Sequence, residues 1–196
     1  TRKAGKVLPQ ILSVFNRAGY DVITYVTDHP GDGKEFVKNR CGEMDLVVCC
    51  GGDGTFNETV SGILLSGCDT PVGYIPAGST NDFAGSLGLA TDPILAAKNI
   101  VEGTPQPYDV GSFNGRHFTY VASFGAFTRS SYATPQSVKN ALGHTAYVLG
   151  GISELSQIRN EHVRMEIDGE LVEDDFLFGA ICNSTSIGGI ITLPPN

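Results

Sequence analysis

A short apolar segment that ends in a cluster of glycines constrains the fold of this chain most strongly. The run from Leu46 to Cys50 has the length and β-branched content of a buried parallel strand. It stops at the sequence Gly-Gly-Asp-Gly-Thr, and apolar residues at helical spacing follow over residues 55–66. A strand, a glycine turn and a helix in this order predict backbone N–H groups at a helix start that face a bound phosphate.

The acid inside this turn indicates what kind of ligand the turn binds. Gly51, Gly52 and Gly54 let the main chain approach phosphate oxygens, because no Cβ intervenes. A lone carboxylate at Asp53 would repel a phosphate, so a divalent cation between the two reconciles them. The alternative is a tight turn without a ligand. Three glycines, an acid and the hydroxyl of Thr55 together favour a nucleotide phosphate.

A second polar turn follows the next apolar strand, which is predicted over residues 71–75. It places two hydroxyls, an amide and a carboxylate in four residues: Ser79, Thr80, Asn81 and Asp82. On its own such a cluster is typical of a helix N-cap, here for a helix over residues 82–87. The carboxyl ends of neighbouring parallel strands meet at one edge of a sheet. We therefore expect both turns to share one crevice, which makes a joint binding site the better interpretation.

The remaining pattern divides the chain into two parts. Before residue 104, helical segments alternate with apolar strands, as in βα units with a parallel sheet. The predicted elements there are helices near 7–19, 34–42 and 92–102 and a strand over 21–27. Beyond it, Asn114-Gly115 and Asp168-Gly169 predict β-hairpins, with a helical section over 136–158 and a strand over 176–182.

This change of pattern predicts two domains. We expect an α/β nucleotide-binding domain with a parallel sheet over residues 1–106. A mostly antiparallel β-sandwich domain is expected over residues 107–196.

Composition narrows the range of functions. The net charge of −8 argues against a nucleic-acid partner, because a protein that binds a phosphate backbone needs a basic face. Five cysteines without CxxC spacing indicate reduced thiols rather than disulfides or a zinc site. No apolar run approaches the 18 or so residues of a transmembrane helix.

The two turns and their flanks resemble the diacylglycerol kinase catalytic domain family. That family includes bacterial diacylglycerol kinases, related lipid kinases and sphingosine kinases. The resemblance covers nearly the whole chain and rests on Gly51–Glu58, Pro71–Ala84, Leu87-Gly88, Asp109–Gly111, Asn114–Arg116, Val121–Gly125 and Ser184–Gly189. NAD kinases and phosphofructokinases share the first motif, whereas the Asn-Asp-Phe-Ala end of the second points to lipid kinases. The chain looks most similar to the soluble enzymes of Gram-positive bacteria.

The resemblance implies a role for each site residue. ATP would be bound by Thr27, Gly51, Gly52, Asp53, Gly54, Thr55, Phe56, Asn57 and Ser79. Asp53 would be a catalytic acid that acts through Mg²⁺, and Asp82 a second acid near the transferred phosphate. Glu58, beside Asn57, would either reach phosphate or metal or simply complement the helix dipole.

Three departures from the family pattern affect these expectations. The resemblance places a first strand with a nucleotide loop before Thr1. It places a further metal site and a general-base carboxylate after Asn196. Gly85 stands where the family commonly has an arginine, which removes one cation that could face phosphate.

The resemblance thus predicts ATP-dependent phosphorylation of a lipid hydroxyl, with diacylglycerol converted to phosphatidic acid as the favoured reaction. The implied cofactors are ATP and Mg²⁺. The implied partner is a lipid at the membrane surface, for a cytoplasmic protein peripheral to the inner membrane face, and a homodimer fits the family. Two alternatives stay open: an NAD kinase, and a non-catalytic nucleotide- or lipid-binding module.

Overall fold

The computed structural model describes residues 2–126, 128, 159–184, 186, 187, 191 and 192. Its contacts divide the chain into two compact units, Thr1–Tyr120 with Asn183–Asn196, and Val121–Cys182. The predicted domain boundary at residue 106 stays a prediction. No helix among the residues described is long and apolar enough to cross a bilayer.

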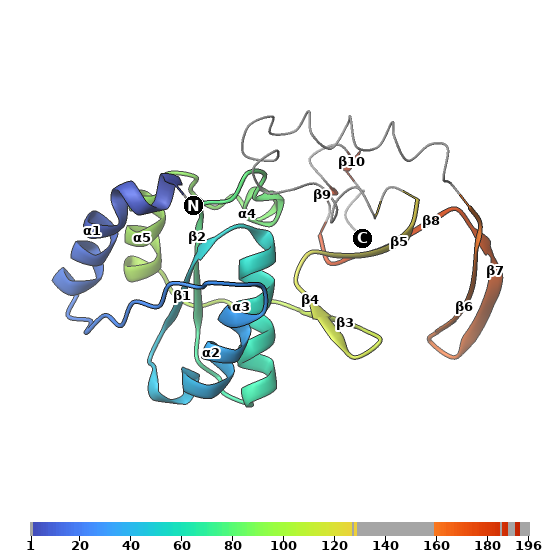
Figure 1. Ribbon diagram of the computed structural model, residues 1–196, viewed down its shortest axis with the longest axis horizontal. Helices are drawn as coiled ribbons and strands as arrows, with labels where there is room; N and C mark the ends of the chain where they lie inside the picture. Colours follow the sequence, from blue (N-terminus) through green and yellow to red (C-terminus); the bar gives the residue numbers. More distant parts are fainter. Residues whose placement is uncertain (1, 127, 129–158, 185, 188–190, 193–196) are drawn as a thin grey trace. The chain divides into compact units, whose positions relative to one another are not determined.

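The first unit consists of a small parallel sheet with helices on both faces (Figure 1). Its helices are α1 (Arg2–Arg17), α2 (Asp32–Arg40), η1 (Cys41–Glu43), α3 (Asp53–Ser66), α4 (Asp82–Ser86) and α5 (Pro93–Glu102). Its strands are β1 (Val47–Gly51), β2 (Val72–Pro76), β3 (Gly111–Phe113), β4 (Arg116–Phe118), β9 (Ser186–Ile187) and β10 (Ile191–Thr192). The predicted α/β region with a parallel sheet is thereby confirmed.

The parallel pair β1–β2 has buried hydrophobic residues packed on both of its faces. Successive residues of a strand face opposite sides of the sheet, so Ile75 and Tyr74 pack in different directions. Ile75 lies fully buried with residues of α1 and α5. Tyr74 packs on the other side against Phe56 of α3 and Phe83 of α4. In Figure 1, α1 and α5 accordingly lie on one side of β1–β2, and α2 and α3 on the other.

The strand predicted over residues 21–27 is wrong, because the structure assigns no strand to this segment. A strand needs a neighbour that completes its backbone hydrogen bonds, and β1 pairs only with β2 among the described strands. The segment is exposed, with Val26 at 78%. It is held to α2 instead: Tyr25 stacks on Phe36 with ring centroids 3.9 Å apart, and its hydroxyl donates to Asp32 at 2.5 Å.

Both predicted hairpins are confirmed. Asn114 and Gly115 join β3 to β4 with positive φ angles of 49° and 72°. Asp168 and Gly169 join two strands of the second unit in the same way, with φ angles of 51° and 86°. Positive φ at both central residues is what a type I′ turn requires, and Asn-Gly and Asp-Gly pairs accept it readily.

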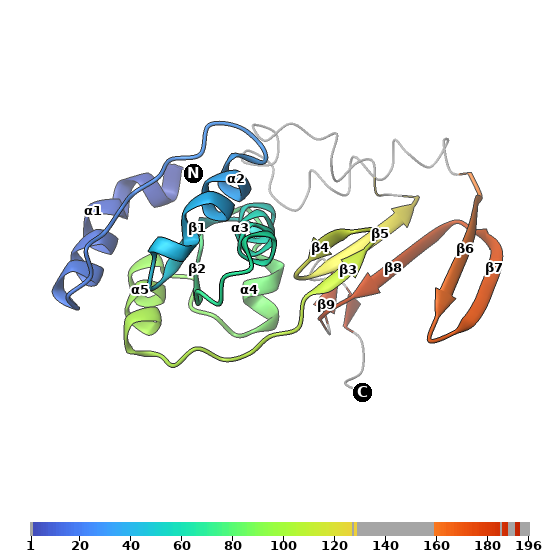
Figure 2. The ribbon, with the colours of Figure 1, turned by 90° about the horizontal axis from the view of Figure 1, so that it is seen from below.

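The second unit contains antiparallel strands, as expected for the C-terminal part. Its described strands are β5 (Val121–Gly125), β6 (Glu161–Ile167), β7 (Glu170–Phe176) and β8 (Phe178–Cys182). β5 pairs with β8, and β6 forms the hairpin with β7 that Figure 2 shows in orange. The helical section predicted over 136–158 lies outside the described residues.

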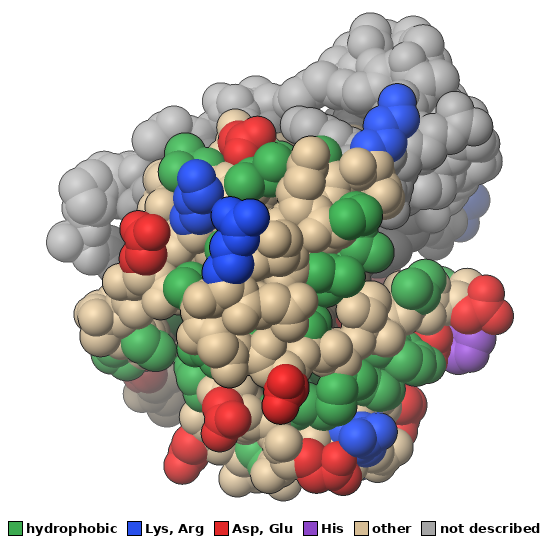
Figure 3. Space-filling model, turned by 90° about the vertical axis from the view of Figure 1, so that its left-hand side faces the viewer, with side chains coloured by type: hydrophobic (Ala, Val, Ile, Leu, Met, Phe, Trp, Pro, Cys, Tyr) green, Lys and Arg blue, Asp and Glu red, His purple; other side chains and the backbone are tan. Residues whose placement is uncertain are grey.

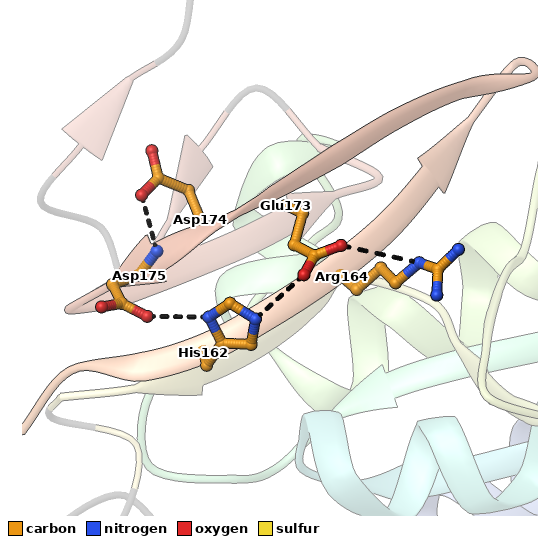
Figure 4. A network of polar contacts seen from close by, with 5 residues as sticks. All are labelled: His162, Arg164, Glu173, Asp174 and Asp175. Carbon is orange, nitrogen blue, oxygen red and sulfur yellow. Dashed lines mark hydrogen bonds and ion pairs between the residues drawn. The ribbon is translucent and has the colours of Figure 1, made fainter.

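A histidine on the β6–β7 hairpin is surrounded by carboxylates (Figure 4). His162 Nδ1 lies 2.9 Å from Asp175 Oδ1, and Nε2 lies 3.2 Å from Glu173 Oε1. The other oxygen of Glu173 lies 3.8 Å from Arg164 Nε. These hydrogen bonds, with that of Asp175 the stronger, raise the pKa of His162 above its usual 6.5.

We expect this contact to make the hairpin weakly pH-dependent. The pKa of His162 is raised in the folded hairpin, so the protonated ring stabilises the folded state. This stabilisation is fully present below pH 6.5 and is lost as the pH rises through the pKa of the folded state. An NMR titration of the ring should give a pKa above 6.5. Asp175→Asn should lower that pKa more than Glu173→Gln. An equal or larger effect of the Glu173 variant would contradict this ranking.

On the face that Figure 3 shows, most acidic side chains lie in the lower half of the view, and two basic side chains lie side by side at the upper left. The described part of this face has no continuous basic stripe of the kind that a nucleic-acid backbone requires.

Candidate functional site

Two chain bends meet at the carboxyl edge of the parallel sheet. The ladder of β1 and β2 ends with Gly51 opposite Pro76. One residue further, Ala77 N–H donates to the carbonyl oxygen of Gly51 at 2.7 Å. The chain after each strand therefore leaves the sheet at the same place. We call the segment 51–55 the first bend and the segment 77–82 the second bend.

The bends touch through two glycines. A Cβ added to Gly78 would lie 2.5 Å from the Cα of Gly52 and 2.7 Å from the side-chain oxygen of Asn81. A Cβ added to Gly52 would lie 3.2 Å from the Cα of Gly78. Real Cβ atoms do not approach backbone atoms as closely as the first of these distances. Gly78 is therefore required by packing at this junction, whether or not a ligand binds there.

Asp53 joins the first bend to the start of α4. Its Oδ2 accepts from the N–H of Asp82, and its Oδ1 from the N–H of Phe83, both at 3.2 Å. These two N–H groups belong to the first turn of α4 and have no partner within the helix. An acid from another segment thus does the work of an N-cap.

Asn81 stabilises the second bend from within. Its side-chain oxygen accepts from Gly78 N–H at 2.8 Å, and its amide donates to the Gly78 carbonyl at 3.1 Å. The residue has a left-handed backbone with φ of 55°, which asparagine tolerates better than most residues. The N-cap interpretation of this cluster is thus only partly right. Asn81 occupies the cap position of α4, but Asp53 accepts the hydrogen bonds.

Burial dominates the electrostatics of Asp53. The carboxylate lies beside the ring cluster of Phe56, Tyr74 and Phe83, whose neighbouring centroids are 4.4 and 5.0 Å apart. Burial raises the pKa of Asp53, while the N–H groups of Phe83 and Asp82 oppose that rise. Burial also raises the pKa of Tyr74, and the charge of Asp53 raises it further.

The Tyr74 hydroxyl is buried without a hydrogen-bond partner among the described residues. It lies near enough to Asp53 for each group to shift the pKa of the other. Hydrogen bonding between the two groups opposes the burial-driven rise in the pKa of Asp53 and adds to that in the pKa of Tyr74, although their arrangement falls short of full hydrogen-bond geometry. Sequence reasoning missed this group, because Tyr74 occupies a plain buried-strand position.

The helix after the first bend begins earlier than predicted, at Asp53 rather than at residue 55. Phe56 N–H makes the first helical hydrogen bond, to the Gly52 carbonyl at 3.0 Å. The N–H groups of Gly54 and Thr55 therefore precede the helical ladder. Gly54 is exposed, and a Cβ built on it has no neighbour within 4 Å. The helix start thus leaves these N–H groups outside the helical hydrogen bonds, as an anion-binding site requires.

Other predicted site residues are committed to structural contacts. The Phe56 ring is buried in the core. Asn57 holds the end of β4, donating to the His117 carbonyl at 3.2 Å and accepting from Thr119 N–H at 2.9 Å. Glu58 accepts from Gly31 N–H at 2.9 Å, which holds its side chain at the start of α2.

The remaining predicted residues lie at two places. Ser79 and Asp82 belong to the second bend, Ser79 exposed and Asp82 half-buried. Thr27 is exposed and lies near Gly33, whose added Cβ would be 3.4 Å from the Thr27 methyl and 3.6 Å from Glu58. Thr27 thus lies beside α2, whereas Ser79 and Asp82 belong to the second bend.

No group of three or more His, Cys, Asp or Glu side chains that could hold a metal ion occurs in the part of the chain that the structure describes. Of the Ser184–Gly189 segment, Ser186 and Ile187 form β9, and residues 185, 188 and 189 lie outside the described residues.

Comparison with known proteins identifies the family of this chain. The diacylglycerol kinase catalytic domain family matches residues 1–113. A diacylglycerol kinase of Bacillus subtilis (strain 168) is 37% identical over 193 residues, which are 97% of this chain and 64% of the relative. One of Staphylococcus carnosus (strain TM300) is 34% identical over 97% of this chain and 63% of its own length.

A crystal structure of a diacylglycerol kinase from Bacillus anthracis str. Sterne superimposes with a TM-score of 0.71 at 26% identity. The alignment covers 97% of this chain and 61% of that one. The chain spans less than two thirds of the length of these relatives. The match to more than half of its residues nevertheless defines its family. The chain belongs to the diacylglycerol kinase catalytic domain family.

Proposed function

We propose that this chain forms the nucleotide site of an ATP-dependent lipid kinase. The kinase would transfer the γ-phosphoryl group of ATP to the hydroxyl of diacylglycerol and release phosphatidic acid and ADP. The observation that supports this most directly is the junction of the two bends, where Asp53 binds the N–H groups of Asp82 and Phe83. It brings a helix start, two acids and close-packed glycines to one sheet edge.

The first bend suits the phosphates of ATP. The N–H groups of Gly54 and Thr55 precede the helical ladder of α3, and the space beside the Gly54 Cα is open. Phosphate binding at a helix start uses such groups together with the helix dipole. Phe56 and Asn57 enter the proposal through their main chain only, because their side chains serve the core and β4. Ser79 and Thr27 are proposed as further ATP contacts.

Magnesium fits the donor set around Asp53. Mg²⁺ keeps several waters and is usually bound by one or two carboxylates together with substrate phosphates. A single half-buried carboxylate at the edge of an open helix start meets that description. The ion would neutralise charge on the transferring phosphoryl group. Asp53 would position it, and Asp82 would lie near the transferred phosphate.

The lipid acceptor is proposed from the relatives. Those compared above are diacylglycerol kinases. We therefore infer a diacylglycerol whose head group reaches the bends from the surface of the membrane. Cytoplasmic location, binding to the inner membrane face and a homodimer remain parts of this proposal.

The test is a phosphoryl-transfer assay on the protein purified at its natural length. It uses γ-labelled ATP, Mg²⁺ and phosphatidylglycerol vesicles that contain diacylglycerol. Parallel reactions replace diacylglycerol with sphingosine or NAD, or omit it. We expect a labelled phosphatidic acid that requires both Mg²⁺ and diacylglycerol.

Each other outcome identifies an alternative. Labelled NADP without lipid product would make the protein an NAD kinase. Label in phosphatidylglycerol or in sphingosine would change the acceptor while keeping the lipid kinase. Stabilisation by ATP without any labelled product would indicate a non-catalytic binding module. In the last case, Gly85→Arg is the first substitution to test, because the family commonly has arginine at this position.

A further inference from the structure

The hydroxyl of Tyr74 is not explained by the packing of the fold. Tyr74 is buried, with 5% of its surface exposed, and its ring is stacked against Phe56 in the core between β2 and α3. Its hydroxyl oxygen has no hydrogen-bond partner among the described residues. Besides burial, the charges of three ionisable side chains, Asp53, Cys49 and Cys50, raise the pKa of this hydroxyl.

Stability alone favours phenylalanine at this position. A buried hydroxyl without a partner loses its hydrogen bonds to water and gains none in return. Phenylalanine would fill the same space between Phe56 and Phe83 without that loss. The hydroxyl therefore requires an explanation other than packing. Of the groups near it, only Asp53 belongs to the junction of the two bends.

The contacts of Asp53 leave room for a further donor. Its two hydrogen bonds to the start of α4 are long for charge-assisted bonds, at 3.2 Å each. A carboxylate has about four acceptor sites, so these two N–H groups and the N–H of Asp53 itself leave room for one more donor. The Tyr74 hydroxyl already affects Asp53 as a hydrogen-bond donor, which opposes the burial-driven rise in the pKa of that carboxyl, so it is the group placed to occupy this site.

We propose that Tyr74 is a positioning residue of the nucleotide site, whose hydroxyl donates to the Asp53 carboxylate when magnesium nucleotide binds at the two bends. This inference rests on the proposed function. The bond would fix the orientation of Asp53 toward the ion. The Tyr74 hydroxyl thus lowers the stability of the ligand-free protein and strengthens the binding of magnesium nucleotide.

The test compares two tyrosine variants that lose only a hydroxyl. Tyr74→Phe removes the unpaired one. Tyr108→Phe is the matched control: Tyr108 also contacts Phe83, at 5.3 Å between ring centroids, but its hydroxyl donates to the Asn183 carbonyl at 2.7 Å. Thermal unfolding is measured without ligand, and affinity for ATP is measured by calorimetry with Mg²⁺ and with EDTA.

We expect the two variants to differ in opposite ways. Tyr74→Phe should keep or raise the ligand-free Tm and weaken ATP binding in Mg²⁺ by about tenfold, with little change in EDTA. Tyr108→Phe should lower the ligand-free Tm by about 1–3 °C and leave ATP binding unchanged. Because Tyr74 acts through Asp53, Tyr74→Phe should have no further effect on ATP affinity in an Asp53→Asn background.

The outcomes separate the inference from the function on which it rests. If the wild-type protein does not bind ATP, the proposed function fails and the inference fails with it. If the wild type binds ATP in Mg²⁺ and Tyr74→Phe binds it equally well, only the inference is overturned. A lower ligand-free Tm for Tyr74→Phe would likewise overturn it, since the hydroxyl would then be structural. Additive effects of the Tyr74 and Asp53 variants would show that Tyr74 acts elsewhere.

Discussion

Replacing Gly54 by alanine should preserve the fold and weaken ATP binding by about 10–100-fold, or roughly 1.4–2.8 kcal/mol. The added methyl group has no neighbour within 4 Å in the protein, so it causes no clash in the ligand-free state. Gly54 lies in the first turn of α3, where alanine fits the helical backbone. Alanine also leaves the unfolded chain with less conformational freedom than glycine does, which favours folding. The free energy of unfolding should therefore stay the same or rise by up to about 1 kcal/mol.

The expected loss of ATP binding depends on the open space beside the Gly54 Cα. If phosphate oxygens approach the N–H groups of Gly54 and Thr55, a methyl group at residue 54 occupies part of their path. Denaturant unfolding and calorimetric titration with ATP and Mg²⁺ measure the two effects separately.

Gly5→Ala is the matched control for this variant. Gly5 is an exposed glycine of α1 whose added Cβ also meets nothing within 4 Å, and α1 packs on the other face of the sheet. Gly5→Ala should give a comparable gain in stability with unchanged ATP affinity. Normal ATP binding by Gly54→Ala would mean that phosphate does not bind at the start of α3.

Much of this site could be predicted because its signals are local. An apolar run that stops at glycines predicts both the strand and the turn, and β1 and α3 confirm that order. The parallel pairing of β1 with β2 brings both polar turns to one edge. That step required only the rule that parallel strands end together. Asn-Gly and Asp-Gly predicted the two hairpins equally well, because a type I′ turn depends on two adjacent residues.

The strand that is wrong and the contacts that sequence reasoning missed depend on partners distant in sequence. The segment 21–27 has the composition of a strand, but none of the described strands pairs with it. Asn57 and Glu58 have the residue types of phosphate or metal ligands, yet they bind Thr119 and Gly31, 62 and 27 residues away. No local pattern indicates such contacts. The same is true of Asp53, whose hydrogen bonds to α4 span 29 and 30 residues.

Asp53→Ala should therefore damage both the fold and the reaction. The variant leaves the N–H groups of Asp82 and Phe83 without their acceptor, which is equivalent to removing the cap of α4. Loss of a helix cap costs about 0.5–2 kcal/mol, so we expect a drop of about 1–2 kcal/mol in the free energy of unfolding. Phosphoryl transfer should fall by at least about 10²–10³-fold, because preorganised electrostatic stabilisation is lost.

Asp53→Asn separates these two effects. The amide keeps one carbonyl oxygen as an acceptor for one of the two N–H groups, but it carries no charge for a magnesium ion. Its stability should lie between those of the wild type and Asp53→Ala, while its phosphoryl transfer should be as low as that of the alanine variant. Chemical denaturation and the labelled-ATP assay give the two readouts.

Asp92→Ala provides the control for a cap without a role at the bends. Asp92 is the N-cap of α5 and accepts from Ile94 N–H at 3.1 Å and from Leu95 N–H at 2.8 Å. Its removal should cost about as much stability as Asp53→Ala while leaving ATP binding intact. If Asp53→Asn retained near-normal transfer, the charge of Asp53 would have no part in the reaction. The acid would then be a cap for α4 alone, and magnesium would have to be held by other residues.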